Sequence, residues 1–483
     1  MEEIKEQNST KKSPKLKLNT KNTLKIAFAF FGILMLWQVY NTYCPIILEA
    51  LLKNKVDHLH YIIGIIMALD NVAAILIMPI FGKLSDKTNT KWGKRMPYLI
   101  IGMLLTIIVF PFIALMCMWN SLAGVIVFMM IFLVIMQSYR SPAVALMPDV
   151  TPKPLRSKAN GLINLVGYMG GVLITVMGML PFFKLNDEST LADVQSKVIW
   201  PFAISTIILV GVLLFLVITI KENKMVSEVQ DSIDEGEKEI DLTEEIGENN
   251  KLSKTDKRNF IILLVAIFLW FMSFNSFETF GSLYFKDVVG DSTMYSTMAT
   301  VLSVTSILSF IFFSTISNRI GRKWTIAIGL ISLIVALAAI AIVSVIPGIN
   351  FVTGTGKEAR VTMGWKIFYI GMSAILGVGW ALVNINSFPM AVEYSNKYNL
   401  GKFTSYYYIS SMLAQSITPI LVGLIMDFSD LGLRALFVYA AIVMGLSFVT
   451  FIFIKEKLKV KERLEKNKGE KKSALEILGE IDD

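Results

Sequence analysis

The chain has 483 residues, of which 54% are hydrophobic and 17% are charged, and its formal net charge at pH 7 is +8. A soluble protein carries about a quarter charged residues, so this composition excludes an ordinary soluble domain and indicates a chain that mostly faces lipid. Two cysteines, Cys44 and Cys117, lie in apolar segments and are too few for a disulfide framework.

The first 23 residues are polar and lysine-rich, which is too hydrophilic and too long for a cleaved signal peptide. Twelve apolar segments follow, each long enough to cross a bilayer, which takes about 20 apolar residues. They lie near residues 24–52, 59–81, 96–118, 121–147, 160–183, 198–220, 259–285, 293–316, 324–347, 364–391, 403–426 and 432–454. We therefore predict an all-α polytopic membrane protein with two six-helix halves.

The segment over residues 221–258 divides these halves and holds 12 acidic and 7 basic residues with few large apolar ones. This composition predicts a disordered tether, and a regulatory or partner-binding segment is the alternative. The expected parts are therefore a tail over 1–23, a half over 24–220, a linker over 221–258, a half over 259–455 and a tail over 456–483.

Lysine and arginine set the expected orientation, because loops rich in these residues stay in the cytoplasm. The four short loops on the side of the linker carry more of them than the six opposite loops, and both tails are lysine-rich. We expect both termini in the cytoplasm of a multi-pass plasma-membrane protein, and this use of basic residues argues against nucleic-acid binding.

The most specific motif is the turn over residues 82–95, which contains Gly82, Asp86, Gly93, Lys94 and Arg95. Gly82 would allow two helices to approach closely, and Gly93 would allow a backbone reversal. Asp86 is expected to pair with Lys94 or Arg95. The motif resembles the signature loop between helices 2 and 3 of major facilitator transporters.

A weaker copy of this turn lies in the second half, at residues 317–323. Asn318 stands where Asp86 does, so we expect the first turn to be the stronger latch. Acid–base pairs at these loops are predicted to hold the outward-facing state and to release in the inward-facing one; the alternative is that the charges only set topology. The further gating residues are Asp149, Arg156, Arg319, Gly321, Arg322 and Glu393.

Three ionisable residues lie inside the predicted spans, where such residues are costly and usually functional. Arg140 is the candidate substrate anchor or counter-ion. Glu278 is the candidate proton carrier, because a carboxylate in an apolar cavity can be protonated at neutral pH. Asp70, followed by Asn71, is a second coupling candidate and could contribute oxygens to a Na⁺ site, or could pair with Arg140. H⁺ is the expected coupling ion and Na⁺ the alternative, with no other cofactor.

Polar residues at helical spacing, interleaved with tryptophan and tyrosine, accompany these charges. Amides and hydroxyls can hydrogen-bond a polyhydroxylated ligand while an aromatic ring covers its C–H face. Helix packing and interface belts are the alternative explanation. The candidate substrate-binding residues are Trp37, Tyr40, Asn41, Arg140, Asn275, Trp380, Asn384 and Gln415.

Taken together, the twelve spans, the turn over 82–95 and the runs over 139–149 and 384–393 resemble one branch of the major facilitator superfamily. That branch holds the glycoside–pentoside–hexuronide:cation symporters and the sucrose-type transporters. Ala74 and Met78 stand where the melibiose-type members carry cation-binding aspartates, and Val144 stands where the sucrose-type members carry a substrate arginine. Those sites therefore do not transfer directly.

The resemblance implies a monomeric secondary transporter that couples H⁺ or another cation to symport of a sugar or glycoside. The alternative is a proton-coupled exporter of amphipathic molecules with the same fold. An enzyme is disfavoured, because the sequence has no nucleotide loop, metal-ligand cluster or nucleophile–base motif. The expected partners are a small solute and the lipid bilayer.

Overall fold

A computed structural model of the chain describes residues 18–152, 155–230, 254–354, 360–392, 394 and 400–454. Within these residues, 12 helices are long and apolar enough to cross a membrane. The first six are α2 (Thr20–Leu52), α3 (Leu59–Lys87), α4 (Met96–Met118), α5 (Leu122–Asp149), α6 (Arg156–Gly178) and α7 (Leu191–Thr219). The second six are α9 (Lys254–Asp287), α10 (Thr293–Ile320), α11 (Arg322–Val345), α12 (Met363–Val392), α13 (Leu400–Phe428) and α14 (Ala435–Ile452).

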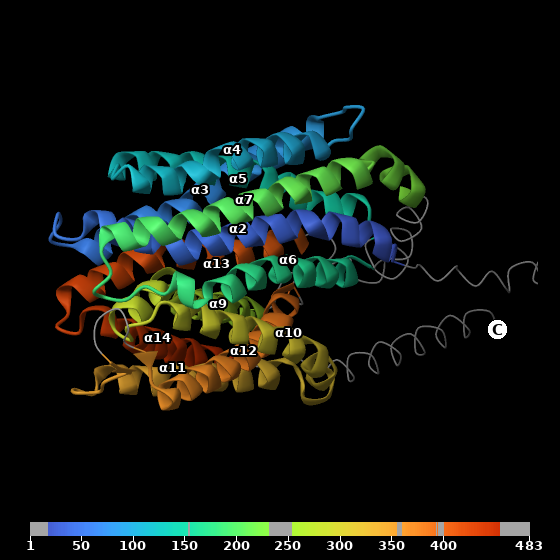
Figure 1. The fold of residues 1–483 in the computed structure, drawn as a ribbon. Helices are drawn as coiled ribbons and strands as arrows, with labels where there is room; N and C mark the ends of the chain where they lie inside the picture. The colour runs from blue at the N-terminus through green and yellow to red at the C-terminus, as the bar shows by residue number, and fades with distance from the viewer. Residues whose placement is uncertain are drawn as a thin grey trace, which may run out of the picture.

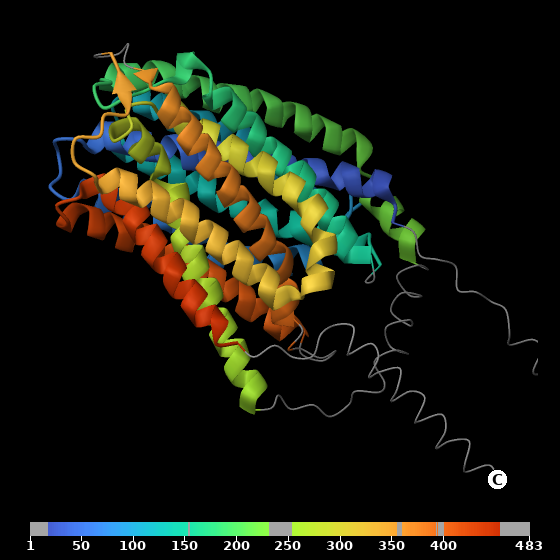
Figure 2. The same ribbon diagram turned by 90° about the horizontal axis from the view of Figure 1, so that it is seen from below.

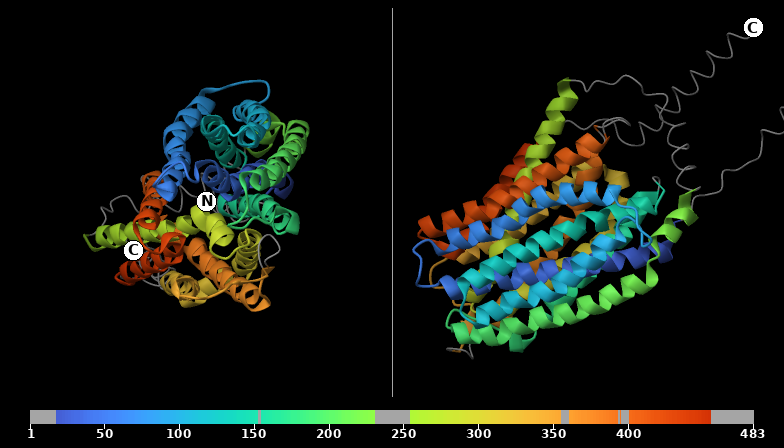
Figure 3. Two further views of the ribbon diagram at one scale, coloured as in Figure 1. Left: turned by 60° about the vertical axis from the view of Figure 1, so that its left-hand side comes forward. Right: turned by 90° about the horizontal axis from the view of Figure 1, so that it is seen from above.

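These helices run side by side along one axis, and α2–α7 form one group beside α9–α14 (Figure 1). Long apolar segments become helices in lipid because a helix satisfies its backbone hydrogen bonds internally. The view along the bundle separates the blue-to-green first half from the yellow-to-red second half (Figure 3, left). The prediction of two six-helix halves is confirmed by this arrangement.

Two ends of the bundle are distinguished below. The linker end is the one where α2 begins, α7 ends, α9 begins and α14 ends (Figure 2). The distal end carries the loops that follow α2, α4, α6, α9, α11 and α13. It also carries two short 3₁₀ helices, η2 (Pro181–Phe183) and η5 (Gly432–Arg434), and an antiparallel pair of strands, β1 (Val352–Thr353) and β2 (Arg360–Val361).

The first helix of each half lies at the centre of the bundle. Among the twelve spans, α2 and α9 have the largest buried share. They contact each other as well as helices of their own half. Functional side chains on α2 and α9 are therefore placed between the two halves.

The linker differs from its prediction at both ends. Residues 222–230 are helical, and α9 begins at Lys254, inside the segment predicted to be disordered. Local contacts explain the first helical stretch, because Glu222 is buried against the loop between α3 and α4. Both predicted tails lie almost entirely outside the described residues, as does the acidic middle of the linker.

Candidate functional site

Arg140 of α5 lies against Trp37 of α2, with the guanidinium carbon 5.5 Å from the centroid of the indole ring. This is a cation–π contact, and both side chains are half-buried. Tyr408 of α13, in the other half, lies within electrostatic range of Arg140. Arg140 thus connects helices of both halves, and Trp37 presents an aromatic face next to a positive charge.

Glu278 of α9 also faces the opposite half. It lies inside the spanning helix, nine residues before α9 ends at Asp287. Its side chain is half-buried, hydrogen-bonds the side chain of Asn275 and lies within electrostatic range of Tyr168 of α6. The phenol of Tyr295 donates to the backbone carbonyl of Glu278 at 3.3 Å. A carboxylate of the second half is therefore surrounded by phenols from α6 and α10.

Buried polar groups near these charges have unused hydrogen-bonding capacity within the described part of the chain. Gln137 of α5, one turn before Arg140, is fully buried, and neither its amide nitrogen nor its oxygen has a partner there. The same holds for Oδ1 of Asn275 and Oγ of Ser282 on the Glu278 face of α9. Because an unsatisfied buried polar group is costly, each of these groups would be stabilised by a hydrogen-bond partner.

The remaining predicted substrate residues occupy different surroundings. Tyr40 is fully buried behind Trp37 and packs on Phe132 at a ring distance of 5.7 Å, so it supports the Trp37 ring in this state. Trp380 stacks on Phe274 at 3.8 Å. Asn41 is half-buried at the same turn of α2.

Asn384 and Gln415 are half-buried, and their amide nitrogens donate to the backbone carbonyls of Trp380 and Ser411, one turn earlier. Asn71 donates to the backbone carbonyl of Gln415 at 3.4 Å, which connects α3 to α13. The amide nitrogens of Asn384 and Gln415 are therefore engaged by the backbone of their own helices.

Some predicted residues fall outside what the structure describes. Glu393 is not among the described residues, and for Asp70, Arg156 and Arg319 only the backbone is described. Gly321 adopts a positive φ of 89° and precedes the first residue of α11, and Arg322 begins that helix, half-buried. The second latch therefore has the predicted turn.

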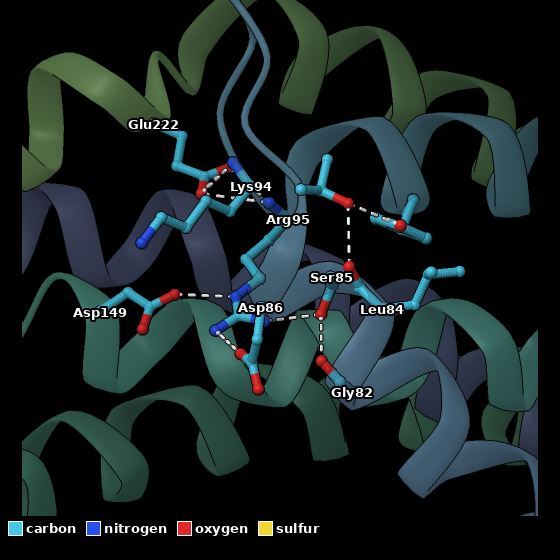
Figure 4. Close-up of polar contacts among 10 residues, drawn as sticks. Gly82, Leu84, Ser85, Asp86, Lys94, Arg95, Asp149 and Glu222 are labelled. Carbon is cyan, nitrogen blue, oxygen red and sulfur yellow. Dashed lines mark hydrogen bonds and ion pairs between the residues drawn. The ribbon is translucent and has the colours of Figure 1, made fainter.

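The first latch is formed around Arg95, which is 5% exposed (Figure 4). Its guanidinium donates to Asp149 of α5 at 2.8 Å, pairs with Asp86 of α3 at 2.6 Å and donates to Ser85 at 2.6 Å. Burial alone would lower the pKa of Arg95, but these bonds to Asp149 and Asp86 more than offset it, and the net direction is upward. Of the two cations offered by the sequence, Arg95 makes the pairs, while the side chain of Lys94 is exposed.

Both predicted glycine roles are borne out by geometry. A Cβ on Gly82 would lie 2.9 Å from Oγ of Ser141, so α3 and α5 approach closely there. Gly93 has φ +115°, and a Cβ on it would lie 2.1 Å from a carboxylate oxygen of Glu222. The reversal at Gly93 therefore also makes room for an acid that the sequence did not single out.

Glu222, at the start of the linker, is a further member of the cluster around Arg95. It is 2% exposed and accepts hydrogen bonds from the backbone N–H groups of Lys94, Arg95 and Met96 at 2.8–3.1 Å (Figure 4). These N–H groups begin α4, where the helix dipole favours an anion. Glu222 was missed because its sequence context is an acidic linker, and only its place directly after a spanning helix distinguishes it.

The distal end, in contrast, joins the two halves. The ammonium group of Lys286 on α9 lies 2.8 Å from the carboxylate of Glu49 on α2, and each side chain is 5% exposed. Lys286 also contacts its neighbour Asp287. The sequence analysis did not select these residues, because each lies at the end of an apolar run, where a snorkelling charge is ordinary.

A second distal contact joins α3 to α13. Asp427 of α13 accepts hydrogen bonds from the backbone N–H groups of His60 and Tyr61, at 3.2 and 2.8 Å, and lies 2.7 Å from Nδ1 of His60. A residue of one half thus caps the first turn of a helix in the other. Close by, a Cβ on Gly64 would lie 2.1 Å from the carbonyl oxygen of Pro419.

A third distal contact joins the end of α6 and the loop after it to α10. Thr300 donates to Thr175 at 2.7 Å, and the Leu185 backbone N–H donates to Ser292 at 2.8 Å. A Cβ on Gly178 would lie 2.2 Å from Oγ of Ser296. We call these three sets the distal contacts; together they close the distal end.

The Arg95 pairs are intact while the distal contacts are formed, and their partners Asp86, Asp149, Ser85 and Glu222 all lie in the first half or at the start of the linker. The expectation that this latch breaks when the distal end closes is therefore wrong for the described cluster. The physical reason is that it joins α3, α5 and the α3–α4 loop, which all belong to one half, so its pairs do not depend on how the two halves sit against each other.

Comparison with known proteins is consistent with this architecture. The family model of the Major Facilitator Superfamily matches residues 26–356 and 361–481. A lactose permease of Lactobacillus delbrueckii subsp. bulgaricus is 21% identical over 365 residues, covering 72% of this chain and 53% of that protein. The match thus spans about half the length of this curated relative.

Two solved structures share the fold at low sequence identity. A crystal structure of a D-xylose-proton symporter has a TM-score of 0.66 and 11% identity, covering 90% of this chain and 98% of the other. A partially occluded inward open conformation of the xylose transporter XylE from E. coli has a TM-score of 0.62 and 10% identity, covering 91% and 100%. At such identities the likeness shows the fold alone.

Proposed function

The chain belongs to the Major Facilitator Superfamily, and we propose that it is a proton-coupled symporter that imports a sugar or glycoside across the plasma membrane by alternating access. Both tails and the linker are assigned to the cytoplasm, as the distribution of lysine and arginine indicates. In that orientation the distal end is external, and the structure, with its distal end closed, corresponds to an inward-facing state.

The observation that carries the proposal is the position of Glu278. It is a half-buried carboxylate inside the spanning helix α9, nine residues before that helix ends at Asp287, it faces the opposite half, and its electrostatic neighbours come from α6 and α10. A charged carboxylate at this depth is costly, so a change of its protonation state alters which arrangement of the halves is favoured. Glu278 is the proposed proton carrier.

The solute class is supported by the groups that surround the charges. Trp37 beside Arg140 provides an aromatic face and a cation. The amide of Gln137 provides a donor and an acceptor, and Oδ1 of Asn275 an acceptor, that have no partner in the described chain. Such a set suits a ring with several hydroxyls. The name of the matched relative, a lactose permease, supports the same class.

The test uses purified protein in liposomes and a panel of mono- and disaccharides, with the wild type beside Glu278→Gln. We expect sugar-dependent alkalinisation of the outside medium in the wild type and its loss in the variant. Sugar counterflow, which needs no net proton movement, should be retained by Glu278→Gln if Glu278 carries the proton. Loss of both activities would assign Glu278 to solute binding instead.

Three outcomes would replace parts of the proposal. Uptake that requires Na⁺ and moves no protons would replace the coupling ion. Sugar-driven proton movement that persists in Glu278→Gln would remove Glu278 from coupling. No response to any sugar, with or without Na⁺, would overturn the solute class in favour of another solute or of export.

A further inference from the structure

A groove of about 360 Å³ lies at the linker end of the first half, between the α3–α4 loop and the start of the linker. It is distinct from the site around Glu278 and Arg140, because it opens beside the ends of α4 and α7 rather than between the halves. Its lining comes from the loop (Lys91, Trp92), from α4 (Met96, Ile100), from α7 (Val217) and from the start of the linker (Ile220, Lys221, Glu222, Asn223, Lys224).

Three exposed lysines surround this groove: Lys91, Lys221 and Lys224. Lys224 lies 3.8 Å from Glu228, in a pair whose side chains are 72% and 48% exposed, so its charge is only weakly compensated. The single acid in the lining, Glu222, is buried, and its oxygens accept backbone hydrogen bonds of the loop. The mouth of the groove is therefore positive.

The wall of the groove is apolar and continues into the surface that faces lipid. Ile100 of α4 and Val217 of α7 line it, and Val217 is 41% exposed. Trp92, at the rim, is 58% exposed. Tryptophan is enriched at the level of the lipid headgroups, and long lysine side chains reach the same level. The depth agrees, because α7 ends at Thr219 and α4 begins at Met96.

The groove is held in shape by contacts between the start of the linker and the α3–α4 loop. The side chain of Asn223 donates to the backbone carbonyls of Thr90 and Lys91, at 3.1 and 3.2 Å. Together with Glu222, this contact fixes the start of the linker to the loop. The lysines of the loop and of the linker are thus kept on the same rim without any ligand.

We propose that this groove binds an anionic phospholipid, whose phosphate is held by Lys91, Lys221 and Lys224 and whose acyl chain lies along Ile100 and Val217. Basic pockets at helix ends bind acidic headgroups by charge, at a depth where an acyl chain remains in hydrocarbon. A bound lipid would connect the loop, α4, α7 and the linker, and so would stabilise the first half.

The test compares thermal unfolding of the full chain in detergent with added phosphatidylglycerol, phosphatidylcholine, glycerol 3-phosphate or inorganic phosphate. We expect only phosphatidylglycerol to raise the melting temperature at micromolar concentration. The variant Lys91→Gln/Lys221→Gln/Lys224→Gln should bind it about a hundredfold more weakly, since each lysine near a headgroup contributes about a fivefold factor.

The matched control is Lys83→Gln/Lys87→Gln/Lys257→Gln. It removes three exposed lysines from the same end of the bundle, and none of them lines the groove. Its apparent Kd for phosphatidylglycerol should stay within about twofold of that of the wild type, because the phosphate ligands remain.

A second readout does not depend on stability. Phosphatidylglycerol with brominated acyl chains should quench the fluorescence of Trp92, measured as the difference between the wild type and Trp92→Phe. Equal effects of phosphatidylcholine, equal loss in the control variant, or no Trp92 quenching would overturn the proposal. A response to the free phosphates at the same concentration would make the groove an anion site and would also overturn it.

Discussion

The two ends of the bundle use buried charges in different ways. At the distal end, Glu49 and Lys286 belong to different halves, and Asp427 of one half caps a helix of the other. At the linker end, Arg95 and its partners Asp86 and Asp149 belong to one half. The distal charges therefore join the two halves to each other, whereas the linker-end charges hold the parts of one half together.

This difference shows that a charged motif at a helix end is not by itself a gate. What matters is whether its partners lie in the same moving body. We expect the Arg95 cluster, whose partners all lie in one half, to have little effect on the relative population of two arrangements of the halves. We expect the distal contacts, which join the two halves, to have a large effect.

The largest effect is expected from the buried pair at the distal end. Lys286→Met leaves the Glu49 carboxylate buried without its cation, which costs about 3–5 kcal/mol. The closed distal end should become at least about a hundredfold less populated. In a Cys44→Ala/Cys117→Ala background, maleimide labelling of Ser296→Cys, at a position that is 3% exposed and part of the distal contacts, should accelerate accordingly.

The double variant Glu49→Gln/Lys286→Met is the control for this prediction. It removes both buried charges, so the labelling rate should return most of the way toward that of the background. Unchanged labelling in Lys286→Met alone would mean that the pair does not hold the halves together.

The next largest effect is expected where α3 and α13 touch through their backbones. Gly64→Ala places a methyl group 2.1 Å from the carbonyl oxygen of Pro419, and a backbone atom cannot move aside as a side chain can. Such overpacking costs about 1–3 kcal/mol, so labelling of Ser296→Cys should rise about fivefold to a hundredfold.

Gly211→Ala is matched to this change, because its added methyl group has no atom within 4 Å apart from its chain neighbours and the backbone of its own helix. Its labelling rate should stay within about twofold of that of the background. If both alanine variants behave alike, the close backbone approach does not limit closure.

The smallest effect on opening is expected at the linker end. Arg95→Gln removes two ion pairs and should lower the free energy of unfolding of the first half by about 2–3 kcal/mol while leaving Ser296→Cys labelling unchanged. Asp86→Asn should cost less than about 1 kcal/mol, since the Asp86 side chain is 61% exposed and screened by solvent.

Thermal unfolding measures the stability of the first half, and the labelling assay measures opening of the distal end. Using both separates the two effects of Arg95→Gln. Because the pKa of Arg95 is raised above its ordinary value, the stabilisation it provides should be fully present below that value and be lost only in strongly alkaline solution. Faster labelling in Arg95→Gln would show that the cluster does bias the halves.

Local features of the sequence were sufficient to predict much of this molecule. Twelve apolar runs of sufficient length predict twelve helices, and the turn with Gly93 and Arg95 needs residues that are near in sequence. The partnership of Glu49 with Lys286 is different, because two ordinary charges at helix ends become a pair only when two halves pack. No spacing rule connects them.

Glu222 shows the second limit. Its burial depends on the three backbone N–H groups that donate to its carboxylate. Those groups lie close to Glu222 in space but are separated from it in the sequence by several helices. Composition assigned it to a solvated tether. At the central site, Arg140 and Glu278 could be selected from the sequence. An ionisable residue inside an apolar run is recognised without knowing which residues contact it.

The cap that Asp427 places on α3 makes one backbone amide a reporter of opening at the distal end. The Tyr61 amide is hydrogen-bonded to a carboxylate of the opposite half, so its proton is protected only as long as the halves stay together at the distal end. Each opening exposes this amide to bulk water without unwinding the helix behind it. The deuterium uptake of Tyr61, compared with that of residues one turn further along α3, is therefore expected to measure how often the distal end opens.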